Sequence, residues 1–179
     1  KSGDILVFMS GEFDITVTVA ALIAADPQNK LEIYPLFGRL SKEEQESVFN
    51  ETAQGKTKVV VATNIAETSV TIDGITTVID CGIAKVNFYN QKDFTSSLVP
   101  LPISRSSCEQ RKGRAGRTAA GQCYRLYSEQ DYKSFDNGDY VVVDGSTQLF
   151  QGNMQLIINS IRKARPDEVD EGDFMVRQP

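Results

Sequence analysis

The chain has 179 residues, of which 40% are hydrophobic and 24% are charged, and its formal net charge is −5. This length suits one domain with a hydrophobic core, and the negative charge restricts any nucleic-acid binding to a local basic patch. There is no histidine, and the three cysteines are widely spaced, so a Cys/His zinc site and histidine-dependent catalysis are excluded. We expect no metal site. No apolar run reaches the ~20 residues that span a membrane. Few cysteines fit a reducing compartment, so we expect a cytoplasmic protein that does not contact a membrane.

The first eighty residues alternate predicted strands with predicted helices. Strands are predicted over four apolar runs: residues 5–9, 31–36, 58–62 and 74–80. Helical spacing of apolar residues predicts a helix over 14–25. Ser41, with Glu44 three residues later, forms a capping-box pattern that predicts a helix over 42–49. This alternation is typical of βαβ units, so we expect an α/β fold with a mostly parallel sheet.

After Gly82 the pattern changes to that of a β-hairpin. Residues 83–89 and 97–103 favour β-structure, and turn-forming residues at 90–93 lie between them. We therefore predict a hairpin over about 83–103 that interrupts the βαβ series.

The C-terminal third is predicted to hold a strand, a short helix and a longer helix. Gly121 precedes a strand over 122–127, and Ser128 precedes the short helix. The longer helix, over 153–164, is predicted from the spacing of four apolar residues: Met154, Ile157, Ile158 and Ile161. We expect a domain over 1–135 and a helical extension over 136–179.

Residues 104–117, S-R-S-S-C-E-Q-R-K-G-R-A-G-R, form an arginine-rich segment that we call the arginine segment. Its basic residues are Arg105, Arg111, Lys112, Arg114 and Arg117. The arginine fork matches phosphate oxygens, and Gly113 and Gly116 allow a backbone to approach a ligand closely. We predict a helix here, N-capped by Ser106 or Ser107. The segment fits a polyphosphate-binding surface, and the alternative is a solvated basic helix face.

A second polar segment, the polar loop (residues 62–74), follows a predicted buried strand at the edge where α/β sheets bind ligands. It contains hydroxyls, an amide and two carboxylates: Thr63, Asn64, Glu67, Thr68, Ser69, Thr71 and Asp73. Such groups suit a phosphodiester backbone, with Asp73 accepting from a ribose hydroxyl. The alternative is a loop whose Thr and Asn cap a helix. By contrast, residues 55–57 only end like a P-loop, because Asn50 replaces the required glycine, and we expect an exposed turn.

These segments resemble motifs of one enzyme family. The polar loop, A-T-N-I-A-E-T-S-V-T-I-D-G, resembles motif V of the DEAH-box helicases of superfamily 2, and Q-R-K-G-R-A-G-R (110–117) resembles their motif VI. I-L-V-F-M-S-G (5–11) is similar to motif IV, and residues 34–49 are similar to the block after it. The four motifs occur in the order found in the family, and the sequence most resembles the bacterial HrpA-type branch. The resemblance implies a RecA-like three-layer α/β/α fold.

The resemblance also implies that the chain is the second motor domain of an NTP-dependent RNA helicase, cut from a longer chain. The first RecA-like domain of that chain would be the main binding site of both the ATP (or other NTP) and the Mg²⁺. On motif position, three residues would reach the triphosphate, the arginines as fingers: Gln110, Arg114 and Arg117. Phe49 would stack on the base and Asp73 would contact the ribose. From the residues alone, Phe49 fits better as a core residue. Arg111 would form structural salt bridges instead.

The nucleic-acid partner implied by the resemblance is single-stranded RNA, with DNA as an alternative. Its backbone would meet five residues: Ser10, Gly11, Thr63, Asn64 and Thr71. The hairpin would meet an incoming strand, and the aromatic residues near its tip (Phe88, Tyr89 and Phe94) could stack on bases or pack internally. Residues 136–179 either begin a winged-helix region or pack back on the sheet. The alternative function is a helicase-like RNA-binding or protein-interaction module without motor activity.

Overall fold

The computed structural model describes residues 3–90, 95–117, 120–132, 139–150 and 153–169. Within these ranges only the backbone is described for residues 88–90, 95–96, 130–131, 143, 145–150 and 153–161. No helix in the described part is long and apolar enough to cross a bilayer.

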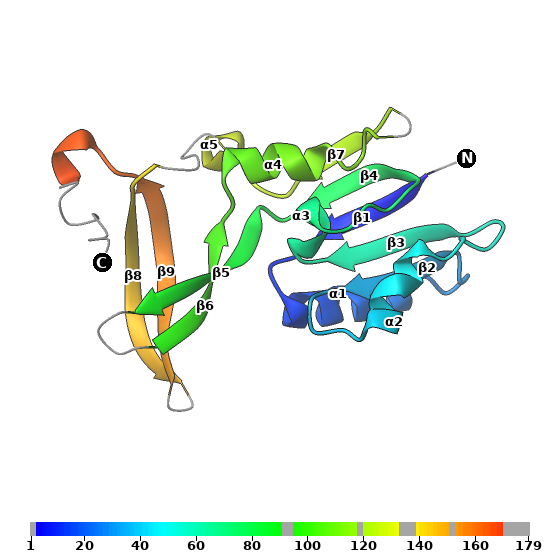
Figure 1. Cartoon of the computed structure of the whole chain (residues 1–179), viewed down its shortest axis with the longest axis horizontal. Coiled ribbons are helices and arrows are strands. Elements are labelled where there is room, and N and C mark those ends of the chain that lie inside the picture. The colour runs from blue at the N-terminus through cyan, green and yellow to red at the C-terminus, as the bar shows by residue number, and fades with distance from the viewer. Residues whose placement is uncertain (1–2, 91–94, 118–119, 133–138, 151–152, 170–179) are drawn as a thin grey trace, which may run out of the picture.

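Five parallel strands form the central sheet (Figure 1). They are β1 (Asp4–Phe8), β2 (Leu31–Leu36), β3 (Thr57–Ala62), β4 (Ile75–Asp80) and β7 (Gln122–Arg125). Their order is β2-β3-β1-β4-β7, and each neighbouring pair is parallel. All five strands were predicted from the sequence. Because parallel strands need a crossover at every connection, the connecting segments cover the faces of the sheet.

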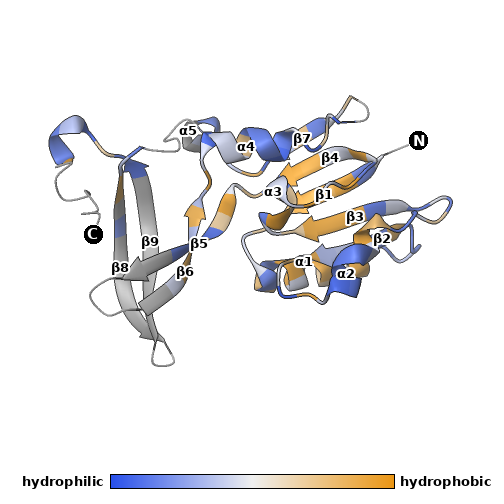
Figure 2. Ribbon diagram, viewed as in Figure 1, coloured by the Kyte–Doolittle hydropathy of each residue, from blue (hydrophilic) through white to orange (hydrophobic). Residues whose placement is uncertain are grey.

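Helices lie on both faces of this sheet. α1 (Glu12–Ala25) covers one face, where its Ile15 packs in a core with Val59 and Val61. The other face is covered by three elements: η1 (Ser47–Phe49), a 3₁₀ turn that follows α2 (Lys42–Glu46), then α3 (Ile65–Thr68) and α4 (Arg105–Lys112). Two clusters of buried apolar residues pack on the sheet, and Figure 2 shows the hydrophobic residues concentrated in its strands. The predicted three-layer α/β/α arrangement is confirmed.

The starts of α2 and α4 are capped by serine side chains. At α2, Glu44 N–H donates to Ser41 Oγ (3.2 Å) and Ser41 N–H donates to the Glu44 carboxylate (2.9 Å), which confirms the capping box. At α4 the N-cap is Ser104, whose Oγ accepts from Ser107 N–H (3.2 Å). The predicted caps Ser106 and Ser107 are therefore wrong. The helix starts as soon as the chain leaves the preceding strand, because a suitable serine is already there.

The predicted hairpin is confirmed. β5 (Ile83–Asn90) and β6 (Thr95–Pro102) pair antiparallel and form a two-stranded sheet of their own. In Figure 1 this hairpin extends away from the five-stranded sheet. Of the aromatic residues predicted to act near its tip, Phe94 lies outside the described residues, and so do the side chains of Phe88 and Tyr89.

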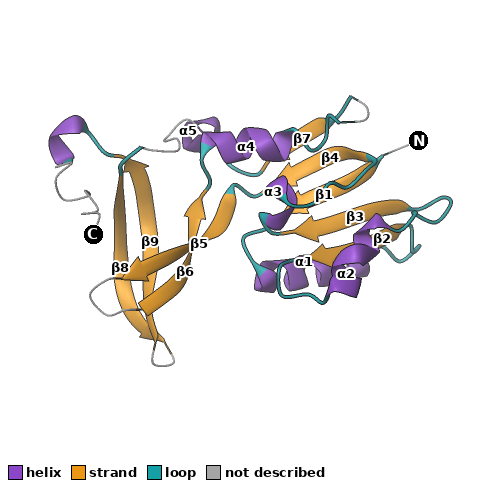
Figure 3. Cartoon of the chain, viewed as in Figure 1, coloured by secondary structure: helices purple, strands orange, loops and turns teal. Residues whose placement is uncertain are grey.

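The predicted C-terminal helix is wrong. Residues 153–164 are instead mostly strand, β9 (Asn153–Lys163), which pairs antiparallel with β8 (Val141–Phe150), as Figure 3 shows. The spacing of the four apolar residues is helical, but three are isoleucines, which favour strands, and the partner strand begins with three valines. Pairing with a segment some ten residues upstream overrides the local pattern. The short helix after Ser128 is α5 (Glu129–Tyr132), as predicted, and η2 (Pro166–Glu168) follows β9.

Candidate functional site

The carboxyl edge of the sheet brings together the turns that follow β1 and β3. These strands are neighbours in register, with Phe8 opposite Ala62, and Met9 N–H donates to the Ala62 carbonyl (2.8 Å). The predicted backbone-binding residues Ser10, Gly11, Thr63 and Asn64 therefore lie at one edge of the sheet. The Ser10 hydroxyl donates to the Asp14 carboxylate, which fixes its orientation at the start of α1.

Asn64 occupies the N-cap position of α3, but its side chain forms no capping hydrogen bond. Its backbone has φ −58° and ψ −8°, which is helical and places the side chain outside the usual cap geometry. Asn64 is also exposed. The alternative that this residue serves as a helix cap is therefore wrong, and its amide can meet a ligand.

Lys85 is a residue of this edge that the sequence did not single out. It lies exposed on β5, and a Cβ at Gly11 would sit 2.8 Å from its Nζ and 2.7 Å from its Cε. The lysine side chain thus lies directly against the Gly11 backbone, and a larger residue there would displace its flexible end. The available signal was a lone cation at the start of an otherwise uncharged strand.

On the face that carries α3 and α4, two arginines contact the polar loop. Arg114 is 7% exposed and donates to the carbonyls of Val70 (2.9 Å) and Glu67. Arg117 is exposed and donates from Nη1 to Thr71 Oγ1 (3.1 Å). Burial, together with the charge of Arg117, lowers the pKa of Arg114. Within the described residues these bonds go to neutral oxygens, so two positive charges lie close together without a neutralising carboxylate bond.

Arg111 has a different environment. Its side chain is fully buried, and it pairs with Glu67 Oε1 (2.7 Å) and Asp80 Oδ1 (2.7 Å). Its guanidinium also lies over the Phe8 ring, 4.7 Å from the centroid. Burial alone would lower the pKa of Arg111, but the charge and hydrogen bonds of Asp80 and Glu67 outweigh it and raise the pKa. The predicted structural salt bridges are confirmed.

The same contacts correct two other expectations. Glu67 was grouped with the backbone-binding side chains, but Arg111 occupies its carboxylate. A solvated basic helix face is wrong for Arg111 and Arg114, because both are buried.

The remaining predicted residues are exposed. Phe49 ends η1 with 54% of its surface exposed, whereas its neighbour Val48 is fully buried. The alternative of a core role for Phe49 is therefore wrong. Asp73 and Gln110 are exposed, Asp73 at the end of the polar loop and Gln110 on α4.

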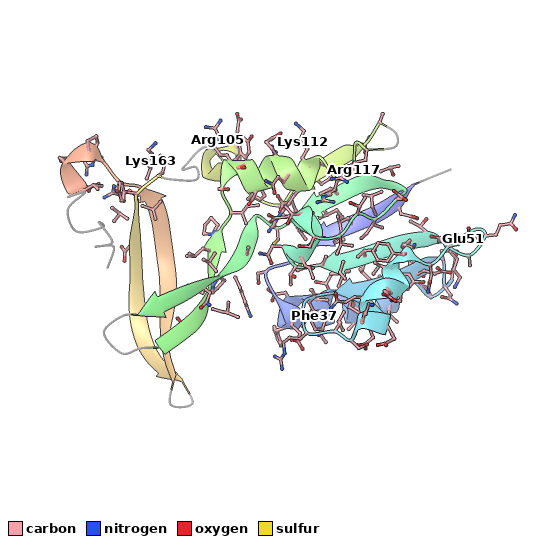
Figure 4. All side chains as sticks on the ribbon, viewed as in Figure 1. Phe37, Glu51, Arg105, Lys112, Arg117 and Lys163 are labelled. Carbon is pink, nitrogen blue, oxygen red and sulfur yellow. The ribbon has the colours of Figure 1, made fainter. Side chains whose placement is uncertain are left out.

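A cavity of about 350 Å³ lies beside the end of α4, lined by residues that include Lys112, Gly116 and Arg125. Arg114 and Arg117 do not line it. Figure 4 shows Arg105, Lys112 and Arg117 spread along the arginine segment, with Arg117 beyond the end of α4. Arg114 and Arg117 thus belong to the surface that contacts the polar loop.

Known proteins share this arrangement of segments. A family model described as the helicase conserved C-terminal domain matches residues 1–119, about two thirds of the chain. The chain belongs to this helicase C-terminal domain family. The match covers β1 to α4 and the polar loop, so it contains every predicted site residue.

Relatives of this domain include the ATP-dependent RNA helicase HrpA of Borreliella burgdorferi, which is 50% identical over 74% of this chain. The human probable ATP-dependent RNA helicase DHX35 is 35% identical over 99% of it. A crystal structure of the E. coli DExH-box NTPase HrpB superposes with a TM-score of 0.69, at 34% identity over 78% of this chain. The resemblance to DEAH-box helicases and the RecA-like fold are confirmed. The chain spans 16% of HrpA, 25% of DHX35 and 17% of HrpB.

Proposed function

We propose that this chain is the second motor lobe of an NTP-dependent DEAH-box RNA helicase. The observation that carries the proposal is the contact of Arg114 and Arg117 with the polar loop. This loop starts at the carboxyl edge of the sheet and then crosses the face that carries the two arginines, which contact its middle residues. One short segment therefore joins a surface suited to nucleic acid with a surface suited to a triphosphate.

On the nucleotide side, neither Arg114 nor Arg117 forms a hydrogen bond with a carboxylate of the described residues. Guanidinium groups bind phosphate oxygens in pairs, and a positioned arginine can accelerate phosphoryl transfer ~10³-fold or more by neutralising charge in the transition state. We assign Arg114 and Arg117 as fingers, with Gln110 beside them on α4. Phe49 would stack on the base and Asp73 would accept from the ribose, and the exposure of both supports these roles.

On the nucleic-acid side, the exposed amide of Asn64 and the hydroxyls of Thr63 and Thr71 suit contacts to a single-stranded backbone. The main chain at Ser10 and Gly11 lies at the same edge as Thr63 and Asn64. We add Lys85 to this set, because its ammonium group lies against Gly11 and would supply a phosphate contact. Backbone contacts of this kind carry no sequence information, so they fit a helicase that acts on varied RNA, or on DNA.

The proposal also requires the other motor lobe of the helicase. NTP would bind between this chain and a first RecA-like domain of the same protein. The resemblance assigns Mg²⁺ to that domain, and the described residues of this chain include no acidic or cysteine cluster that could hold a metal ion. We assign residues 1–135 to the motor lobe and 136–179 to an extension that contains the β8–β9 hairpin.

The test is Arg117→Ala in the full-length protein. We expect RNA-stimulated NTP turnover to fall ~10³-fold, because a finger acts on the transition state, while nucleotide-free RNA binding stays nearly unchanged. Lys112→Ala is the matched control, since Lys112 is a basic residue of the same segment that pairs with Glu109 at 3.4 Å on the surface. Turnover at the wild-type rate in Arg117→Ala would refute the finger assignment.

The chain by itself should hydrolyse no NTP, because the fingers only complete a nucleotide site whose other part belongs to the first RecA-like domain. A steady-state assay of the purified 179-residue chain with RNA measures this directly. RNA-stimulated turnover by that chain would contradict the proposal of a shared site.

A further inference from the structure

Arg111 and Asp80 are the centre of a buried cluster. Both side chains are fully buried, and Arg111 also pairs with Glu67 of the polar loop. Asp80 accepts two further hydrogen bonds, from Gly82 N–H (2.9 Å) and from the Tyr127 hydroxyl (2.8 Å). The cluster therefore joins α4, the polar loop, the end of β4 and the segment after β7.

The cluster also holds the base of the β5–β6 hairpin. The hairpin is inserted in the chain between Asp80, which ends β4, and Ser104, which caps α4. Its two ends are closed by Ile103 N–H, which donates to the Gly82 carbonyl (2.9 Å). The Arg111 guanidinium lies 3.4 Å from the Ile83 carbonyl. A residue of α4 thus reaches the first residue of the hairpin directly.

The base of the hairpin has little room to move independently. Gly82 has φ +75°, and a Cβ there would lie 2.4 Å from the Tyr127 ring. Burial and the hydrogen bonds to Cys108 and Asp80 raise the pKa of Tyr127, so its hydroxyl keeps its proton and continues to donate. Breaking one partner of a buried ion pair leaves an uncompensated charge. The cluster should therefore move as a unit.

We propose that Arg111 is a positioning residue that couples displacement of the β5–β6 hairpin to α4 through its buried ion pairs with Asp80 and Glu67. This rests on the proposed function, in which α4 leads to the fingers and Lys85, on strand β5 of the hairpin, meets the nucleic acid. A strand that displaces the hairpin shifts Gly82 and Ile83. Through Asp80 and Arg111 the shift reaches α4 and the adjoining Arg114. A clamp that only stabilises the fold would not link these two movements.

The variant is Arg111→Lys in the full-length protein. Lysine keeps the positive charge, but its single ammonium group cannot replace the planar fork that reaches two carboxylates and a carbonyl. Tyr127→Phe is the milder second variant, because it removes only the hydroxyl that donates to Asp80. Val78→Ala is the control for general destabilisation, since Val78 is a fully buried core residue of β4.

The first measurement is hydrogen exchange by mass spectrometry, which needs no catalytic activity. In Arg111→Lys we expect faster exchange of the hairpin base, including the Ile103 amide, and of α4, by about tenfold, with α1 unchanged. Tyr127→Phe should show the same pattern more weakly, and Val78→Ala should not single out the hairpin. Hairpin exchange at the wild-type rate in Arg111→Lys would overturn the coupling.

The second measurement compares NTP hydrolysis with strand separation. In Arg111→Lys we expect hydrolysis without RNA and KM for NTP within about threefold of wild type, because no strand then displaces the hairpin, and about tenfold fewer base pairs separated per NTP hydrolysed. A parallel loss of both activities would reduce Arg111 to a structural residue and overturn the proposal. If the wild-type protein hydrolyses no NTP, the proposed function fails, and the exchange measurement still decides whether Arg111 links the hairpin to α4.

Discussion

Arg117 donates from Nη1 to the hydroxyl oxygen of Thr71, 3.1 Å away, and so joins the last arginine of the arginine segment to the polar loop. A threonine hydroxyl can accept and donate at the same time. While it accepts from Arg117, Thr71 keeps its own proton for a phosphate oxygen. A proposed nucleotide contact and a proposed nucleic-acid contact therefore share one hydroxyl group.

Removing that hydroxyl should weaken RNA binding. We expect Thr71→Val in the full-length protein to bind single-stranded RNA about fivefold less tightly, because one net hydrogen bond contributes ~1 kcal/mol. Thr71→Ser restores the hydroxyl and should bind like wild type. Fluorescence anisotropy with a labelled oligonucleotide measures RNA binding by both variants. Equal RNA affinities of Thr71→Val and wild type would contradict the assignment of Thr71.

Lys85 should contribute one phosphate contact. We expect Lys85→Ala to reduce the slope of log affinity against log salt by ~0.7, the value for one neutralised phosphate of a single strand. The matched control is Lys56→Ala, because Lys56 Nζ bonds Asn29 (3.2 Å) just before β3, away from the carboxyl edge. A salt slope in Lys85→Ala equal to that of the control would exclude the contact.

Substitutions at the neighbouring residues Phe49 and Val48 should affect nucleotide binding and folding stability separately. In the 179-residue chain, Val48→Ala should lower the free energy of unfolding by ~2 kcal/mol, because it empties part of the core, whereas Phe49→Ala should change it by less than ~0.5 kcal/mol. In the full-length protein, Phe49→Ala should raise KM for NTP and Phe49→Tyr should not. Denaturant titration and steady-state kinetics measure these effects. A large loss of stability in Phe49→Ala would return Phe49 to the core.

A pH dependence is expected at Glu109. The Tyr132 hydroxyl (2.8 Å), with Arg125 and Lys112, lowers the pKa of this carboxyl below its usual value. A lowered folded-state pKa contributes stability above the unfolded-state pKa, and this contribution is lost as pH falls through the folded-state value. Tyr132→Phe keeps the ring that lies against Arg125 (4.2 Å) and removes the hydroxyl.

We therefore expect the pKa of Glu109 to rise in Tyr132→Phe, and the stability difference from wild type to shrink below about pH 4, the ordinary range of glutamate. Carboxyl ¹³C NMR titration and thermal unfolding at several pH values measure the two effects. A stability difference that stays constant down to pH ~2 would show that the hydroxyl does not act through the ionised carboxyl.

The sequence by itself determined the five strands of the central sheet, the β5–β6 hairpin and the α2 cap. Long apolar runs must be buried on both faces of a sheet, and the capping box bonds only within four residues, so both are local consequences of residue type. The positions of the arginine segment and the polar loop were likewise evident from their composition. None of these features depends on a distant partner.

The tertiary structure decided the features that the local pattern of residues does not specify. Residues 153–163 became a strand because β8 pairs with them, although their apolar spacing is helical. Arg111, Arg114 and Arg117 are chemically identical, yet one is buried with two carboxylates, one bonds carbonyls and one is exposed. Which arginine meets Glu67 and Asp80 is set by how α4 packs on α3 and β4. A sequence pattern contains the charges, but only packing determines which of them are neutralised.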